Sequence, residues 1–192
     1  MKWLCVAHEK EIPGLTEAVP AGFALQVVGV GQFDSLFNFG RLTAAEKPEA
    51  VLLAGSCGTS AGGDIMRTYA CHHFAFPLVS GEELPEFLHS AFQTRPALAM
   101  NRFAAATVLQ NHGVSVSAEK FTANAAAVPA DFPRPIVENM EAASLALACR
   151  RLDIPFTALL CVTNSIGPEA RVQWKQNFRT AGTELARVLQ SL

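Results

Sequence analysis

The run from Phe156 to Val162 constrains the fold of this chain more than any other segment. It is apolar apart from Thr157, so it predicts a strand that must be covered on both faces. Pro155 cannot continue a helix, so the helical pattern before it must end in the turn at 153–155. That helix is expected to place apolar side chains on one face at spacings of three and four, namely Met140, Ala143, Leu147 and Ala148. Residues 137–174 thus predict a helix, a turn, a buried strand and a polar loop.

Strand-like and helix-like patterns alternate along the rest of the chain. The expected strands are Lys2–Ala7, Phe23–Val28, Ala50–Ala54, Ile65–Ala70 and a region between Ala104 and Val116. The expected helices are Phe33–Ala45, Leu84–Phe92 and a C-terminal helix from Gln173, with an apolar stripe of Trp174, Phe178, Ala181, Leu185, Val188 and Leu192. This alternation predicts one α/β domain over residues 1–192, with a largely parallel sheet and helices on both faces.

Composition narrows the class of function. The net charge is −2 and half of the residues are hydrophobic, which argues against the clustered basic surface of a nucleic-acid-binding protein. The apolar runs are too short to span a membrane, and the run at 3–7 is too short for the core of a signal peptide. We therefore expect a cytoplasmic protein.

The cysteines and histidines do not form a metal-binding pattern. The five cysteines contain no CxxC pair and are expected to be small buried side chains. Cys57 lies in a glycine-rich segment, but no base is evident beside it, so a catalytic thiol is disfavoured. His72 and His73 have no acidic or cysteine partner nearby, and we interpret them as surface or interface residues. No metal site is predicted.

Several polar residues follow or precede the predicted strands and are candidates for a site. Glu11 belongs to a charged cluster after the first strand, where side chains of a parallel sheet meet ligands. The segment Gly55–Thr59 is expected to be a turn whose glycines allow close approach of a ligand. Glu141 is expected in a first helical turn, and Asn164 just past the end of a strand. Taken singly, Glu141 and Asn164 fit ordinary helix-start and loop roles.

Three segments together resemble the nucleoside phosphorylase/nucleosidase family. They are the strand with GSCGT (Val51–Thr59), the VENMEAA segment and the VTNSIGPEARVQW segment. The last is most similar to futalosine hydrolase, followed by methylthioadenosine/S-adenosylhomocysteine nucleosidase. The resemblance implies a single three-layer domain with a mixed, mostly parallel central sheet, a homodimer or higher homo-oligomer, a small purine nucleoside as substrate, and no cofactor.

The resemblance also implies roles for individual residues. Glu11 would position and activate the attacking water, as the acidic residue after the family's first strand does. The substrate-binding residues implied are Ser56, Gly58, Phe121, Thr122, Met140 and Glu141. Of these, Phe121, expected in a loop, would stack on the purine, Thr122 would contact its edge, and Met140 with Glu141 would bind the ribose. Glu141 can accept hydrogen bonds from both ribose hydroxyls.

The chain departs from the adenine-specific members at one position. Those nucleosidases carry an aspartate where Asn164 stands, and that aspartate delivers a proton to N7 of the purine. An amide cannot supply the proton, but its NH2 group can donate to N7 and to a 6-oxo group. This favours a 6-oxopurine nucleoside such as futalosine, with release of hypoxanthine for menaquinone biosynthesis by the futalosine route.

Hydrolysis is favoured over phosphorolysis. The arginines that the related phosphorylases carry before the GSCG segment and after the first strand are missing here, although Arg41 and Arg67 remain available to bind an anion. A carboxylate at the attack position also favours water over a phosphate dianion. The alternatives are a methylthioadenosine/S-adenosylhomocysteine-type nucleosidase, a purine nucleoside phosphorylase, and a nucleoside-binding protein without catalysis.

Overall fold

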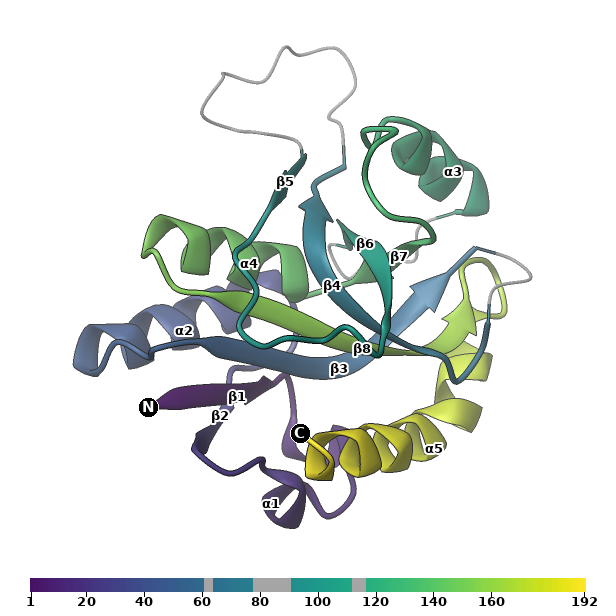
Figure 1. Ribbon diagram of the computed structural model, residues 1–192. Helices are drawn as coiled ribbons and strands as arrows, with labels where there is room; N and C mark the ends of the chain where they lie inside the picture. Colours follow the sequence, from purple (N-terminus) through teal and green to yellow (C-terminus); the bar gives the residue numbers. More distant parts are fainter. Residues whose placement is uncertain (61–63, 78–90, 112–116) are drawn as a thin grey trace.

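Among residues 1–60, 64–77, 91–111 and 117–192, which the computed structural model describes, eight strands form one mixed sheet (Figure 1). In chain order the strands are β1 (Lys2–Val6), β2 (Phe23–Val27), β3 (Val51–Thr59), β4 (Thr68–Ala75), β5 (Ala91–Gln93), β6 (Ala104–Gln110), β7 (Ile136–Asn139) and β8 (Phe156–Ser165). The α/β architecture expected from the alternating patterns is confirmed.

The sheet closes on itself in its central part. The order of paired strands is β2-β1-β3-β7-β6-β4-β5, and β8 pairs with both β3 and β4. Strands β3, β7, β6, β4 and β8 therefore form a ring. The pairs β3–β7, β4–β5 and β4–β8 are antiparallel and the others are parallel, which confirms the mixed, mostly parallel sheet.

Helices cover both faces of the sheet (Figure 1). They are α1 (Leu15–Ala18), α2 (Gln32–Ala45), α3 (Ala118–Ala126), α4 (Ala142–Arg151) and α5 (Ala170–Gln190), with a short 3-10 helix, η1, at Glu9–Glu11. Phe39 of α2 and Leu145 of α4 pack with Leu160 in one core cluster, whereas Leu185 of α5 packs with Leu4 in a second. Each such side chain contributes about 1.5–3 kcal/mol of burial free energy.

Strands β3 and β8 are longer than the sequence predicts. The segment Gly55–Thr59 is not a turn but the second half of β3, because β8 pairs along it and β7 joins at Gly58 and Thr59. Likewise β8 continues to Ser165, so Asn164 lies inside the strand rather than past its end. Pairing with β8 continues through both glycines, and Gly58 is also paired with β7.

Other boundaries also differ from prediction. The segment expected to begin a helix at Val137 is strand β7, which pairs in parallel with β6, and α4 begins only at Ala142. Strand β4 begins at Thr68, because Met66 has a φ of 70° that breaks an extended strand before it. Of the predicted helix Leu84–Phe92, residues 84–90 lie outside the described residues, and Phe92 is in β5.

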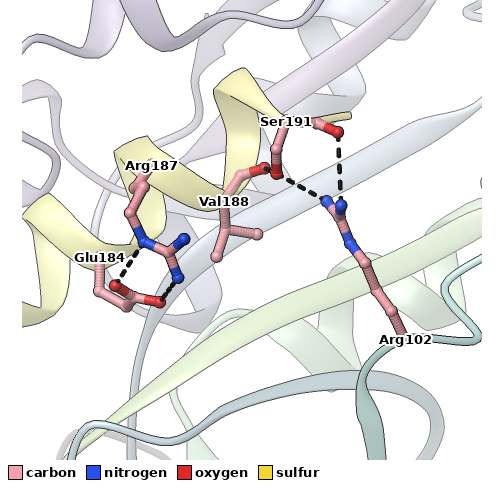
Figure 2. A network of polar contacts seen from close by, with 5 residues as sticks. All are labelled: Arg102, Glu184, Arg187, Val188 and Ser191. Carbon is pink, nitrogen blue, oxygen red and sulfur yellow. Dashed lines mark hydrogen bonds and ion pairs between the residues drawn. The ribbon is translucent and has the colours of Figure 1, made fainter.

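Helix α5 packs against the sheet through one apolar face. Its buried face includes Ala181, Leu185 and Val188, as the stripe predicts, whereas Leu192 is 42% exposed. At its end, Arg102 donates to the hydroxyl and carbonyl oxygens of Ser191 (Figure 2). No helix of the described residues is long and apolar enough to cross a membrane.

Candidate active site

The side chain of Glu141, at the start of α4, is held by a backbone group from a distant part of the chain. Its Oε1 atom accepts a hydrogen bond of 2.7 Å from the backbone N–H of Gly31, in the turn between β2 and α2. The side chain is only 6% exposed, and burial raises the pKa of this carboxyl, while the Gly31 and Asn139 hydrogen bonds oppose the rise. One carboxylate oxygen is thus fixed by the protein. The neighbouring Met140 lies close to the same glycine.

Asn139 connects α4 to strand β3. Its Oδ1 accepts from the backbone N–H groups of Glu141 and Ala142, at 2.9 and 2.7 Å. These are orphan donors of the first helical turn, so Asn139 serves as a helix cap. Its Nδ2 donates to the carbonyl oxygen of Ser56 at 2.9 Å. The position of Glu141 relative to β3 is therefore set by one amide side chain.

Glu11 ends η1 and points a carboxylate oxygen into the protein. Burial, and next the charge of Glu141, raise the pKa of Glu11 from 4.5 to about 7, while backbone hydrogen bonds at His8 and Ala7 lower it. Its Oε2 atom is buried without a hydrogen-bond partner in the described residues. An unpaired buried acceptor is unfavourable, so this oxygen is suited to receive a donor from a ligand or water.

A small cavity lies beside Glu11. It is lined by Glu11, Ser56 and residues of α5, namely Phe178, Ala181, Gly182 and Leu185. Its volume is about 10 Å³, close to the minimum needed for one water molecule. The Ser56 hydroxyl accepts from Trp174 Nε1–H at 3.3 Å. The cavity therefore combines a carboxylate acceptor and a hydroxyl in a space of the size of one water.

Helix α5 approaches η1 closely at Gly182. A Cβ atom there would overlap the carbonyl oxygen of Glu11 and lie 2.7 Å from Cδ of Pro13. Only glycine permits this packing of helix against backbone. The contact fixes the segment that carries Glu11 against the last helix of the fold.

Gly58 lies between two polar side chains from neighbouring strands. It pairs with Glu138 of β7 on one side and with Asn164 of β8 on the other. A Cβ atom on Gly58 would lie 2.9 Å from Nδ2 of Asn164 and 3.2 Å from Oε1 of Glu138. The missing side chain thus leaves room for an amide and a carboxyl to approach the same point.

The amide of Asn164 has a fixed orientation. Its Oδ1 accepts from the Thr163 hydroxyl at 2.9 Å, and its Nδ2 donates to the Ser165 carbonyl oxygen at 3.3 Å. Because a carbonyl oxygen only accepts, the Nδ2 side must carry the NH2 group. The side chain therefore presents a donor toward the space over Gly58 and no proton that an acid could release.

The start of α5 stabilises the strand end that carries Asn164. The Ser165 N–H donates to Oε1 of Gln173 at 2.7 Å, and Nδ2 of Asn177 donates to the Thr163 carbonyl oxygen at 2.8 Å. The two α5 side chains are one helical turn apart and bracket Asn164. Sequence reasoning assigned no role to either.

Phe121 lies in α3, not in a loop as predicted. Its ring is 4% exposed and packs in a cluster with Ile136 and Ile166, which are two residues from Glu138 and Asn164 respectively. Thr122 is exposed, and its hydroxyl donates to the Ala118 carbonyl oxygen. The structure therefore places Phe121 beside the site residues but covered, and leaves Thr122 at the surface.

Cys57 does not have the surroundings of a reactive thiol. It is buried in β3, and burial raises its pKa well above the ordinary value, which disfavours the thiolate. Among the described residues, no three His, Cys, Asp or Glu side chains gather as a metal-binding group would require.

The structure brings together Glu11, Ser56, Gly58, Met140, Glu141 and Asn164 of the predicted set, at the ends of β1, β3, β7 and β8. Sequence reasoning missed Gly31, Asn139, Trp174 and Glu138. Of these, Glu138 could have been placed in a strand from the sequence. The segment 136–138 begins with two β-branched residues and follows a proline, as strands often do. Two carboxylates, an amide donor and a water-sized cavity can bind a polar sugar and position a nucleophile.

Comparison with known proteins identifies the family of the chain and its fold. The model of the family described as "Phosphorylase superfamily" matches residues 24–192. A search of curated protein sequences finds no match.

Similar solved structures include the 5'-methylthioadenosine/S-adenosylhomocysteine nucleosidase of Neisseria meningitidis with methylthio-immucillin-A. Its TM-score is 0.79 at 18% identity, over 100% of this chain and 99% of that chain. The S-adenosylhomocysteine nucleosidase of Streptococcus pyogenes with 5-methylthiotubericidin has a TM-score of 0.81 at 15% identity, over 99% and 94% of the two chains. A mutant nucleosidase of Helicobacter pylori with 5'-methylthioadenosine has a TM-score of 0.79 at 15% identity, over 99% and 96%. At these identities the likeness shows the shared fold.

Proposed function

The chain belongs to the phosphorylase superfamily, and from this premise we propose that it is an N-ribosyl hydrolase that cleaves the glycosidic bond of a 6-oxopurine nucleoside. The observation that carries the proposal is the buried Oε2 of Glu11, which has no hydrogen-bond partner among the described residues and lies beside a cavity sized for one water. Futalosine is the preferred substrate and hypoxanthine the leaving base. The reaction uses no metal or organic cofactor.

The two carboxylates suit the charge that develops during cleavage. Departure of the base leaves a cation-like ribosyl group, which negative charge nearby stabilises. Glu11 holds water against the anomeric carbon and accepts its proton, which requires the ionised carboxylate. Glu141 keeps one oxygen on Gly31 and has the remaining acceptor capacity for the ribose hydroxyls. The same pair of negative groups disfavours a phosphate dianion as the nucleophile.

A methylthioadenosine/S-adenosylhomocysteine-type nucleosidase is the second candidate. It is supported by the likeness to solved nucleosidases over nearly the whole chain. The oriented NH2 group of Asn164 argues for the first candidate, because it complements a 6-oxo group and opposes a 6-amino group.

Product analysis separates the candidates. The purified protein is incubated with futalosine, inosine, methylthioadenosine and S-adenosylhomocysteine, each with and without phosphate. We expect phosphate-independent release of hypoxanthine from futalosine. Adenine release would favour the second candidate, phosphate dependence would indicate a phosphorylase, and binding without turnover would indicate a nucleoside-binding protein.

Replacing Asn164 by aspartate tests the basis of base selection. We expect Asn164→Asp to change the ratio of kcat/KM values for 6-oxo and 6-amino nucleosides by about 10-fold or more toward the 6-amino substrates, because an acceptor replaces a donor. The ratio is measured by competition between inosine and adenosine derivatives with the same 5' group. An unchanged ratio would contradict the proposal that Asn164 selects a 6-oxo base.

We also propose a homodimer, as the resemblance implies. Val30, Phe33 and Phe37 are 53%, 83% and 72% exposed at the start of α2, next to the Gly31 that binds Glu141. Exposed aromatic side chains in one place are typical of interfaces. Sedimentation velocity is expected to show a dimer for the wild type and a monomer for the Phe33→Glu, Phe37→Glu variant. A wild-type monomer at micromolar concentration would contradict the proposal.

A further inference from the structure

Glu138 is a carboxyl group at the site to which the proposed mechanism gives no role. It lies in β7 opposite Gly58, and its Oε1 approaches the point over that glycine from one side while Nδ2 of Asn164 approaches from the other. Asn164 was proposed to bind the purine because its NH2 group is a hydrogen-bond donor. The carboxyl group shares the same space over Gly58.

The face of the sheet on which Glu138 lies is the face of Phe121. Ile136 is two residues before Glu138 and Leu109 is its register partner in β6, and both pack in the cluster that contains Phe121. Side chains two apart on a strand share a face. Ile166, two residues beyond Asn164, belongs to the same cluster. Glu138 therefore lies on the side expected for the base.

The surroundings of Glu138 favour its neutral form. Burial raises the pKa of this carboxyl from 4.5 to about 7, against a smaller opposing effect of a hydrogen bond from Asn111. Within the described residues no Lys, Arg or His side chain forms an ion pair with it. A substantial fraction of the group is thus protonated near neutral pH, as general acid catalysis requires.

We propose that Glu138 is the general acid that protonates the leaving purine at N7, the task that the amide of Asn164 cannot perform. This role rests on the proposed nucleoside hydrolysis. The bond between the anomeric carbon and N9 breaks, and its electron pair passes to the purine, which takes the Glu138 proton at N7. Water forms the new bond to the anomeric carbon and gives its proton to Glu11. Solvent then returns a proton to Glu138 and removes one from Glu11.

The role predicts a dependence on the leaving group. Glu138→Gln is compared with wild type on the purine nucleoside that wild type cleaves and on p-nitrophenyl β-ribofuranoside, whose leaving group departs as a stable anion. We expect kcat/KM to fall by about 10²-fold or more on the nucleoside. On the p-nitrophenyl riboside it should stay within about 3-fold, since no acid is needed there. Glu46→Gln, at an exposed position after α2, serves as the control.

A second variant tests the same role by keeping the carboxyl group. Glu138→Asp retains a side chain that can donate a proton, so its nucleoside rate is expected to be at least about 10-fold higher than that of Glu138→Gln. Full nucleoside activity of Glu138→Gln would overturn the role, and so would equal losses on both substrates, which would indicate a structural effect. Wild type that cleaves no nucleoside would instead overturn the proposed function, and the role with it.

Discussion

Glu11→Gln is expected to lower kcat/KM for nucleoside hydrolysis by about 10³-fold, because positioning and deprotonating the water both depend on the carboxylate. The glutamine keeps the size of the side chain, so the cavity shared with Ser56 and α5 should persist. Steady-state release of the base, with binding of the product base as a check on the intact site, measures the effect.

The control for this prediction is Glu9→Gln. Glu9 belongs to the same 3-10 helix but is exposed, so its replacement should leave kcat/KM within about 2-fold. If Glu11→Gln retained wild-type rate, the carboxylate would not be the group that positions water.

The same variant should be more stable than wild type at high pH. The folded state raises the pKa of Glu11 from 4.5 to about 7, so it favours the neutral form. Stability from this group is complete below about pH 4.5 and is lost as pH rises through about 7. Glu11→Gln is never charged, and at pH 8 we expect it to unfold with a free energy about 1–3 kcal/mol larger than wild type. Denaturant unfolding at pH 5 and pH 8 checks this, and an equal difference at both values would contradict it.

Glu141→Gln is expected to lower kcat/KM by about 10²- to 10³-fold, since each hydrogen bond to a charged group contributes about 1.5–3 kcal/mol. The amide oxygen can still accept from Gly31 N–H, which protects the fold near α2. What is lost is the charged acceptor for the ribose hydroxyls and the negative charge near the developing cation.

A substrate without the 2'-hydroxyl gives this prediction a specific readout. Wild type should prefer the ribonucleoside over the 2'-deoxynucleoside, and Glu141→Gln should lose most of that preference, because the partner of the missing hydroxyl is altered. Glu46→Gln should keep it. If Glu141→Gln kept the preference for the ribonucleoside, Glu141 would not be the residue that binds the 2'-hydroxyl.

The sheet and its layers were predictable from the sequence because burial on both faces produces the apolar run of β8. The extent of β3 was not, because Gly55 and Gly58 are typical of turns. The pairing with β8 keeps both extended, and β7 adds a second partner at Gly58. Tertiary pairing outweighed local preference in the same way at Val137–Asn139.

Candidate residues for the site could be named from the sequence, but their arrangement could not. The resemblance pointed to Glu11, Glu141 and Asn164, and their roles stay predictions. The contact of Glu141 with Gly31 joins residues 110 positions apart, which no local pattern encodes. Glu138 was overlooked because its segment was interpreted as a helix, in which its side chain would not face Gly58.

The close approach of Gly182 to Glu11 makes the site dependent on the order in which the chain is completed. Glu11 follows the first strand, whereas the cavity beside it is walled by the last helix. Every other strand and helix can be made before that wall exists. A growing chain therefore carries Glu11 long before the cavity beside this carboxylate can be enclosed, and the candidate site is complete only once α5 has docked.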